Sequence, residues 1–353
     1  MKLLEKLVLT PGVSGREHRI REFIRQEVKG LFDTIQTDAM GSLICVRLPR
    51  HKGKGKSRAA APRKVMLAAH MDQIGFMVSF IDDRGFIRLN AVGGFDTRNL
   101  FARLVRVTPD LADPSKDLMG VLNPAGRPIH VATEEEKKRT PEVKDFIVDL
   151  GLEADEVRKR VKVGDPVTLV APFTEVGATA VSQCMDNRIA CWIAIEAVRK
   201  LKSHACEVHC VFTSQEEVGL RGALTAAYAV RPDIGIAIDT TLCIDTPGVP
   251  AEERVTAQGG GAALTVMDGS YIADLEVVEA FEKLAQKHDI KHQRSIQSRG
   301  GTDAGALQRA ASGAPTMTLS CPTRYIHTVT EMVLKTDLYA CRDLLALYLE
   351  SVA

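Results

Sequence analysis

Two neighbouring carboxylates, Glu216 and Glu217, stand just beyond the apolar run 208–212. In an extended chain, neighbouring side chains point to opposite sides, so these two glutamates are expected to have different tasks. One of them can bind a metal ion while the other faces a substrate or a water molecule. Such a division requires further metal ligands elsewhere in the chain.

Histidines and carboxylates also stand at the ends of other apolar runs. With the runs that they close or follow, they are His70 and Asp72 (64–69), Asp186 (178–185), Asp239 (234–238) and His327 (316–320, through a loop that contains a proline). Each run predicts a buried strand, and helical patterns alternate with the runs. In open α/β sheets the functional crevice lies outside the carboxyl ends of the strands, so we expect these side chains to converge there.

The segments around these residues resemble family 42 of metallopeptidases, the tetrahedral aminopeptidases, which include glutamyl aminopeptidases. The matching segments are 69–75 (AHMDQIG), 185–188 (MDNR), 215–219 (QEEVG), 300–305 (GGTDAG) and 324–328 (RYIHT). Each motif alone is weak, but the ordered set is specific and covers nearly the whole chain. Gln73 departs from the pattern, since Glu is expected there in many relatives, and this difference concerns fine tuning rather than metal binding.

The resemblance implies two divalent metal ions. Asp186 is expected to bridge them, with His70 and Asp239 completing one site and Glu217 and His327 completing the other. A mixed shell of histidine and carboxylate suits Zn²⁺, with Co²⁺ or Mn²⁺ as alternatives. Two such ions about 3.5–4 Å apart can stabilise both the attacking and the developing oxygen of a hydrolysis reaction.

The remaining acidic residues of these motifs have implied supporting roles. Glu216 is expected to be the general base, which takes a proton from a water that bridges the metals and returns one to the leaving amine. Asp72, two residues from His70 on the same strand face, is placed to accept a hydrogen bond from the second ring nitrogen of His70. The resemblance also implies a cis peptide bond between Asp186 and Asn187.

Two glycine-rich segments are candidate loops near the site. The segment 300–305 does not match the phosphate-binding pattern GxxxxGK[ST], and it predicts a tight substrate-pocket loop before a helix. Gly301, Thr302 and Asp303 are therefore the candidate substrate-binding residues. The segment 259–261 is expected to form a flexible loop close to the site, whereas Cys184 is interpreted as a buried core thiol.

The predicted fold is a mixed α/β sheet with helices on both faces, similar to zinc exopeptidases, with a small inserted β-barrel. Residues 1–73 and 174–353 form the catalytic domain, and residues 74–173 form the barrel, which the resemblance implies is a dimerisation domain. Short apolar runs at 76–81, 86–89, 104–107, 118–122 and 167–170 indicate the barrel strands. A helix is expected to start near Glu153.

Two helix starts are predicted from capping patterns. Ser14 and Glu17 have the spacing of a capping box, and Asp186 is placed to cap the helix that follows it. The basic segment 50–64 has no interleaved aromatic residues for base stacking, so it predicts a solvated loop rather than a nucleic-acid surface.

Composition indicates a globular cytoplasmic protein. The 353 residues are 45% hydrophobic and 26% charged, with a formal net charge of +1, which offers no general attraction to nucleic acid or an acidic membrane. The first residues carry charges where a signal peptide needs an apolar core, and no apolar run approaches the roughly 18 residues of a membrane span. The eight cysteines include no CxxC pair, as is typical of free thiols in a reducing compartment.

From the motifs and the family resemblance, we expect an enzyme that removes N-terminal residues from short peptides. We expect it to be a homo-oligomer, either a dimer or a twelve-subunit shell of dimers. A metal-dependent deacylase of small acylated amines is an alternative, and a requirement for a free α-amino group distinguishes the two. A glycosidase that uses Glu216 and Glu217 is a further alternative. Its carboxylates must flank a sugar bond at roughly 5–9.5 Å, which adjacent residues do poorly, and His70 and His327 would be unexplained.

Overall fold

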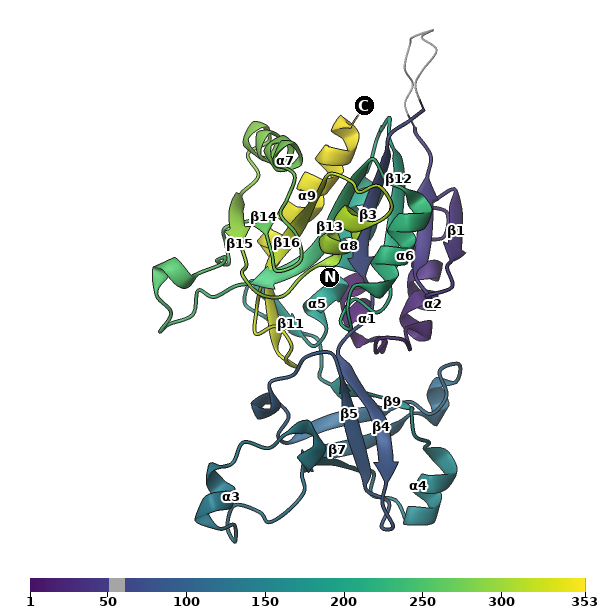
Figure 1. The fold of residues 1–353 in the computed structure, drawn as a ribbon, viewed down its shortest axis with the longest axis vertical. Helices are drawn as coiled ribbons and strands as arrows, with labels where there is room; N and C mark the ends of the chain where they lie inside the picture. Colours follow the sequence, from purple (N-terminus) through teal and green to yellow (C-terminus); the bar gives the residue numbers. More distant parts are fainter. Residues whose placement is uncertain (51–60, 353) are drawn as a thin grey trace.

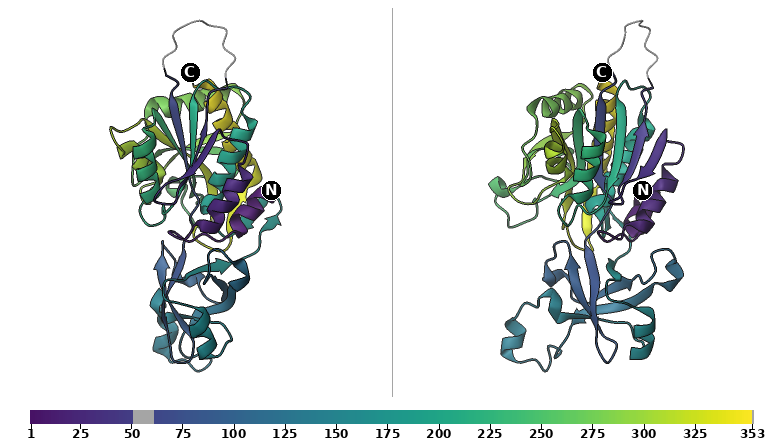
Figure 2. Two further views of the ribbon diagram at one scale, coloured as in Figure 1. Left: turned by 90° about the vertical axis from the view of Figure 1, so that its right-hand side faces the viewer. Right: turned by 45° about the vertical axis from the view of Figure 1, so that its right-hand side comes forward.

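The structure is a computed structural model that describes residues 1–50 and 61–352. An α/β domain is joined to a closed β-barrel, which lies at one end of the α/β domain in every view (Figures 1 and 2). Most of the basic segment 50–64 falls at 51–60, outside the described residues. Among the described residues, no helix is long and apolar enough to cross a membrane.

The α/β domain is built on one mixed sheet. Its main path runs in the order β1-β2-β12-β3-β13-β16-β17-β11-β10, while β14 pairs with β16 and β15. Strands β12, β3, β13 and β16 are parallel neighbours, and antiparallel pairs flank them. The strands are β1 Thr34–Thr37, β2 Leu43–Arg47, β3 Lys64–His70, β10 Thr174–Val176, β11 Thr179–Ser182, β12 Glu207–Thr213, β13 Ile234–Leu242, β14 Ala262–Met267, β15 His292–Ile296, β16 Thr316–Arg324 and β17 Glu331–Leu334.

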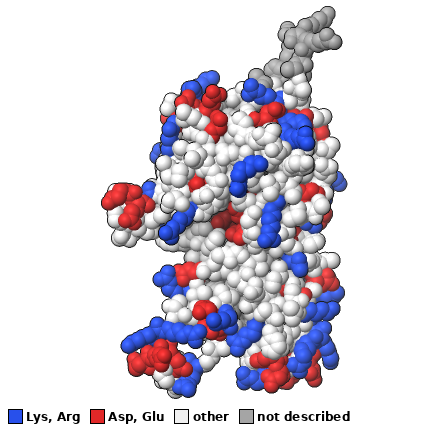
Figure 3. All heavy atoms as spheres, viewed as in Figure 1, with Lys and Arg blue, Asp and Glu red and all other residues white. Residues whose placement is uncertain are grey.

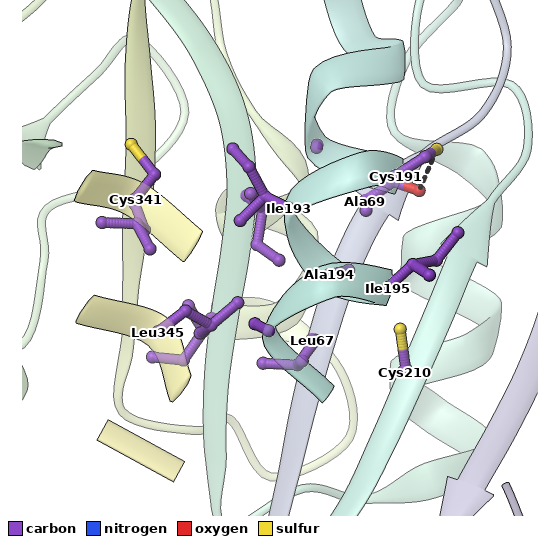
Figure 4. Packing of buried hydrophobic residues seen from close by; sticks show 14 of the residues in the cluster. Leu67, Ala69, Cys191, Ile193, Ala194, Ile195, Cys210, Cys341 and Leu345 are labelled. Carbon is purple, nitrogen blue, oxygen red and sulfur yellow. Dashed lines mark hydrogen bonds between the residues drawn. The ribbon is translucent and has the colours of Figure 1, made fainter. Parts of the chain in front are cut away.

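Helices cover both faces of this sheet, which explains why its central strands are apolar on both sides. In β3, Leu67 and Ala69 face the core formed with α5 (Figure 4), whereas Met66 and Ala68 face the core formed with α6 and α8. The first face carries α1 Lys2–Leu9, α2 His18–Glu27, α5 Met185–Lys200, α7 Leu275–Lys287 and α9 Lys335–Ser351, and the second carries α6 Arg221–Val230 and α8 Asp303–Arg309. The predicted fold class is confirmed.

The inserted domain is a closed antiparallel barrel in the order β4-β5-β8-β7-β6-β9. Its elements are β4 Gly75–Ile81, β5 Ile87–Val92, β6 Arg103–Val107, β7 Leu118–Pro124, α3 Glu134–Lys138, β8 Phe146–Asp149, α4 Ala154–Arg160 and β9 Pro166–Val170. Phe76, Val105 and Leu122 belong to a hydrophobic core separate from that of the sheet. Strand β8 was not predicted, because its short run 146–149 lies in a polar stretch.

Neither predicted helix cap forms. Helix α2 begins at His18, the hydroxyl of Ser14 donates to the carboxylate of Asp72, and Glu17 makes no side-chain cap bond. The capping box is wrong because Ser14 and Glu17 are both buried and bond to loops at the edge of the sheet. Helix α5 has Cys184 as its N-cap, and Asp186 lies inside the first turn with non-helical dihedrals, so its predicted capping role is also wrong.

Strand β16 is longer than predicted. It continues through Pro322 as far as Arg324, so the proline lies within the strand and not in the loop that leads to His327. At the end of the strand, the guanidinium of Arg324 donates to both carboxylate oxygens of Asp245, at 2.6 and 2.7 Å. This bidentate ion pair fixes the point from which the chain turns towards His327.

Candidate active site

A cavity of about 610 Å³ lies at the carboxyl ends of the central strands. In the space-filling view, acidic atoms lie in a hollow where the α/β domain meets the barrel (Figure 3). The candidate residues that line the cavity are His70, Asp186, Glu216, Glu217, Asp239, Gly301, Thr302 and His327. Side chains predicted from distant parts of the chain therefore share one pocket.

The parallel strands bring these residues together. His70 is the last residue of β3 and pairs in register with Thr213, the last residue of β12, whose following turn carries Glu216 and Glu217. Asp239 lies within β13, the other neighbour of β3. The apolar strands thus place polar side chains together at the carboxyl-end edge of the sheet. This is where the functional crevice of open α/β sheets lies.

Asp186 lies between the two histidines. Its Oδ1 is 3.3 Å from Nε2 of His70, and its Oδ2 is 3.5 Å from Nε2 of His327. The peptide bond between Asp186 and Asn187 is cis, as the family resemblance implied. The two distances show that each carboxylate oxygen of Asp186 faces a different histidine. A carboxylate that bridges two cations needs this arrangement.

Each histidine also faces another carboxylate. Nε2 of His327 is 3.4 Å from Oε2 of Glu217. Nε2 of His70 is 3.9 Å from Oδ1 of Asp239 and 3.8 Å from Oε2 of Glu216. Two groups of possible ligand atoms lie within 4.8 Å of one another, one from His70, Glu216 and Asp239 and one from His70, Asp186 and Glu217. Distances alone therefore allow Glu216 as a ligand or as a base.

Burial and mutual repulsion perturb the carboxylates. Burial, with the charges of neighbouring carboxylates, raises the pKa values of Glu216, Glu217 and Asp239, although His70 opposes the shift at Glu216 and Asp239 and His327 opposes it at Glu217. Burial also acts to raise the pKa of Asp186, but hydrogen bonds from His327 and His70 outweigh it and lower that pKa below its usual range. The cluster therefore needs positive charge to keep its carboxylates ionised.

The histidines supply that charge as protons. Burial alone would lower the pKa of His327, but Asp186 and Glu217 raise it to about 11, and neighbouring carboxylates likewise raise the pKa of His70. A divalent ion can replace these protons, because metal ligation requires neutral imidazole and ionised carboxylate. The imidazole and carboxylate donors here fit Zn²⁺, Co²⁺ or Mn²⁺.

Asp72 is fully buried and accepts hydrogen bonds from the loop that carries the two glutamates. It accepts from the backbone N–H groups of Glu216 at 3.0 Å and Glu217 at 3.2 Å, and from the Ser14 hydroxyl at 2.6 Å. Nδ1 of His70 is 3.4 Å away without hydrogen-bond geometry. The expected contact with His70 is thus the longest of these, and the shorter hydrogen bonds of Asp72 hold the glutamate loop.

The three candidate substrate-binding residues are not equivalent. Gly301 and Thr302 line the cavity, and Thr302 is the N-cap residue of α8. Asp303 lies behind the wall, 1% exposed, where it accepts a hydrogen bond from the hydroxyl of Thr213 at 2.5 Å. Burial raises the pKa of Asp303 to about 6, and its remaining oxygen has no hydrogen-bond partner. Asp303 thus faces the strand ends and not the open cavity.

The other glycine-rich segment and Cys184 do not line the cavity. The N–H groups of Gly259 and Gly261 donate to the buried carboxylate of Asp337, which anchors this segment away from the cavity wall. Cys184 is buried, and burial raises the pKa of its thiol far above the usual range, in keeping with a core thiol.

Several cavity residues were not singled out from the sequence. Leu220, Leu242 and Ile326 contribute apolar wall, and Arg299 contributes the only lysine or arginine side chain in the described lining. Gly94 reaches the cavity from the barrel side. Ile326 lies within the RYIHT motif and Leu220 directly follows the QEEVG motif, so the motifs could have indicated both, whereas no sequence signal points to Gly94.

Glu17 is a further buried carboxylate beside the glutamate loop. It is 2% exposed, and one of its oxygens, Oε1, accepts from the N–H groups of Gly15 at 2.7 Å and Gln215 at 3.2 Å. Burial, followed by the charge of Asp72, raises the pKa of Glu17 to about 7. Since Gln215, Glu216 and Glu217 all donate their N–H groups to Glu17 or Asp72, two carboxylates support three consecutive residues.

The mixed sheet with an inserted barrel is a zinc-exopeptidase-like fold. The sequence pattern of the M42 glutamyl aminopeptidase family matches residues 52–344, so the chain belongs to this family of aminopeptidases. The lysyl aminopeptidase of Pyrococcus furiosus is 31% identical over 338 residues, which are 94% of this chain and 91% of that protein.

Two solved structures are similar over nearly the full chain. Aminopeptidase APDkam598 from Desulfurococcus kamchatkensis has a TM-score of 0.91 at 32% identity, covering 99% of this chain and 94% of that chain. The TET1 peptidase of Pyrococcus horikoshii, which can assemble into a tetrahedron or a large octahedral shell, has a TM-score of 0.84 at 30% identity and covers 99% of both chains.

The raised pKa of Glu17 predicts how stability depends on pH. Between about pH 4.3, where an unfolded Glu titrates, and about pH 7, the folded protein binds the extra proton, so this group makes stability fall as pH rises. Glu17→Gln keeps an acceptor oxygen and never ionises. We expect the variant to gain roughly 1–3 kcal/mol relative to the original protein between pH 5 and pH 8. Urea unfolding of both proteins at pH 5 and pH 8 measures the difference in their free energies of unfolding. A difference that is the same at both pH values would contradict the prediction.

Proposed function

We propose that the protein is a dinuclear metallo-aminopeptidase that removes N-terminal residues from short peptides. The observation that carries this proposal is the position of Asp186, whose two oxygens lie 3.3 and 3.5 Å from two different histidines. Membership of the M42 family and the carboxylate-rich surroundings support it.

Five side chains would hold the metals: His70, Asp186, Glu217, Asp239 and His327. Bound ions would supply Lewis acidity, which would polarise a carbonyl and lower the pKa of water. Zn²⁺ is the first candidate, with Co²⁺ and Mn²⁺ as alternatives, because imidazole and carboxylate donors accept all three. The protein contributes a fixed and buried donor set whose carboxylates need a counter-charge.

Glu216 would act as the general base and then as the general acid. Its carboxylate lines the cavity beside His70, and burial raises its pKa above the ordinary range of a glutamate, which makes it a better proton acceptor. Its backbone is held by Asp72 at 3.0 Å, so the side chain starts from a fixed point. Glu216 therefore takes a proton from the attacking water and delivers one to the leaving amine.

The cavity would orient the peptide by its walls. Its volume of about 610 Å³ suits a short peptide end, and Leu220, Leu242 and Ile326 provide apolar surface for side chains. The preference for a free α-amino group is proposed from the membership of the M42 aminopeptidase family. Gly301 and Thr302 are proposed to contact substrate, while Asp303 would support the strand ends from behind.

A metal-dependent deacylase remains the chemical alternative, because the same donor set can cleave any amide. It differs in needing no free amino group. A glycosidase based on Glu216 and Glu217 is disfavoured by the structure, since Glu217 lies 3.4 Å from His327 and shares one cluster with Asp186 rather than facing a sugar bond from the opposite side.

The outer face of the barrel is proposed to form a dimer interface. Leu104 pairs with Val121 across β6 and β7, and Met119 lies nearby on β7. These apolar side chains are 54%, 44% and 49% exposed, respectively, and a grouped apolar surface of this kind is typical of protein–protein contacts. The assembly of the similar TET1 peptidase supports an oligomer, which we propose to be a dimer or a shell of dimers.

The oligomer proposal predicts light-scattering results. The purified protein should be a dimer or larger at micromolar concentration, and Val121→Glu should shift it towards monomer, because a charge would be buried at the interface. Ile272→Glu, at an exposed position in the α/β domain, serves as the matched control. Monomers of the unchanged protein, or equal effects of both substitutions, would contradict an interface on the barrel.

The requirement for a free N-terminus predicts selectivity between paired substrates. A dipeptide amide should be hydrolysed, whereas its N-acetylated form should be turned over far more slowly, because aminopeptidases such as those of the M42 family act at a free N-terminus. The comparison uses kcat/KM for both compounds at the same metal concentration. Equal turnover would move the assignment to a deacylase or an endopeptidase.

The two glutamates should respond differently to the same substitution. Glu216→Gln removes the base but no proposed ligand, so we expect kcat to fall about 10²–10⁴-fold with both metals retained. Glu217→Gln replaces a ligand by a poorer neutral donor, so one metal should be lost and activity should partly return in excess metal. The measurements are metal stoichiometry and kcat for both variants.

These two variants serve as controls for each other. If Glu216→Gln loses metal while Glu217→Gln keeps both ions and loses only rate, the two roles are reversed. If neither substitution affects the rate, the active site is elsewhere.

A further inference from the structure

Glu331, the first residue of β17, links two parts of the proposed metal site. It is 2% exposed, and its two oxygens accept hydrogen bonds from different backbone N–H groups. Oε2 accepts from Asp186 at 2.9 Å, and Oε1 accepts from His327 at 2.7 Å. One buried carboxylate thus contacts the main chain of two proposed ligands that are far apart in sequence.

The sheet topology puts Glu331 in this position. In β17, Glu331 pairs with Ser182 of β11, the strand that leads to Asp186. The next residue, Met332, pairs with Arg324 of β16, the strand that leads to His327. The start of β17 is therefore the point where the two ligand-bearing segments leave the sheet on either side.

Both ligand segments have irregular backbone at this point. Asp186 has φ −77° and ψ 103°, which interrupts the first turn of α5, and His327 has a positive φ of 63°. Residues other than glycine adopt positive φ at a cost, and such conformations persist only where the surroundings hold them. Buried N–H groups outside regular helix or strand also need an acceptor, and Glu331 supplies it for both residues.

We propose that Glu331 is a positioning residue that sets the place of Asp186 relative to His327. The inference rests on the proposed two-metal function. Since His327 belongs to the metal site shared with Glu217, loss of the Glu331 contacts should weaken that site more than the site of His70 and Asp239. Supporting groups of this kind commonly change metal affinity by about 10–100-fold.

A matched control exists elsewhere in the chain. Asp337 is 1% exposed, and it accepts from the N–H groups of Gly259 at 2.7 Å and Gly261 at 3.1 Å. It is thus another buried carboxylate that holds two backbone amides, but it does not line the cavity. Asp337→Asn therefore measures how much stability is lost with such a contact, without the proposed effect on metal affinity.

The test compares Glu331→Gln with Asp337→Asn. Glutamine has one acceptor oxygen, so one of the two amides would face an NH₂ group. Zinc affinity of each site is measured by competition with a chromogenic chelator, alongside thermal unfolding. We expect Glu331→Gln to bind the zinc ion of the Glu217 and His327 site about 10–100-fold more weakly, with recovery in excess zinc. Affinity for the other ion should fall less, although Asp186 is a proposed ligand of both. Asp337→Asn should lower the melting temperature but keep both affinities.

A second variant protects the test against misfolding. Glu331→Asp keeps the charge and both oxygens but shortens the reach, so it should weaken the same site to a smaller degree. The proposal is overturned if Glu331→Gln keeps both zinc affinities and only the melting temperature falls, or if Asp337→Asn weakens zinc binding equally. If the unchanged protein binds no zinc, cobalt or manganese, the proposed function fails first, and the inference fails with it.

Discussion

The candidate site, and the structure around it, depend on holding several negatively charged carboxylates close together where they are buried. Glu216, Glu217 and Asp239 lie beside Asp186 at the strand ends, where burial penalises every ionised carboxylate. Such a cluster would separate or remain protonated unless positive charge and rigid backbone contacts opposed the repulsion. The histidines supply charge in the absence of an ion, and the parallel strands supply a framework in which the residues cannot move apart. A divalent cation is the simplest counter-charge for this arrangement.

The backbone contacts show how the framework is extended beyond the sheet. Asp72 and Glu17 hold the loop of the paired glutamates, and Glu331 holds the segments of Asp186 and His327. The barrel also contributes to the site. At Gly94 an added Cβ would lie 3.7 Å from Nδ1 of His327, and at Gly93 it would lie 2.5 Å from Ile74. The contact at Gly94 is an ordinary van der Waals distance, whereas a side chain at Gly93 would force a shift where the barrel meets the candidate site.

Sequence reasoning reached the parts of the site that periodicity and motif order determine. The run that ends at His70 is apolar on both faces because helices cover both sides of the sheet. Such continuous apolar runs allowed the central strands to be predicted from the sequence. Local polar patterns were less informative. Ser14 and Glu17 have the spacing of a helix cap, but tertiary contacts with the strand ends outweigh that local preference. Pro322 suggested a loop, although it lies inside β16. Glu331 was not singled out from the sequence, because its burial depends on the pairing of β17 with two other strands.

The central claim is that one carboxylate bridges two metal ions in this pocket. Anomalous scattering from crystals grown with zinc tests it most directly, because it locates each ion independently of activity. The account predicts two peaks about 3.5–4 Å apart, one beside His70 and Asp239 and the other beside Glu217 and His327, with Asp186 contacting both. A single peak, or zinc bound away from Asp186, would contradict the account.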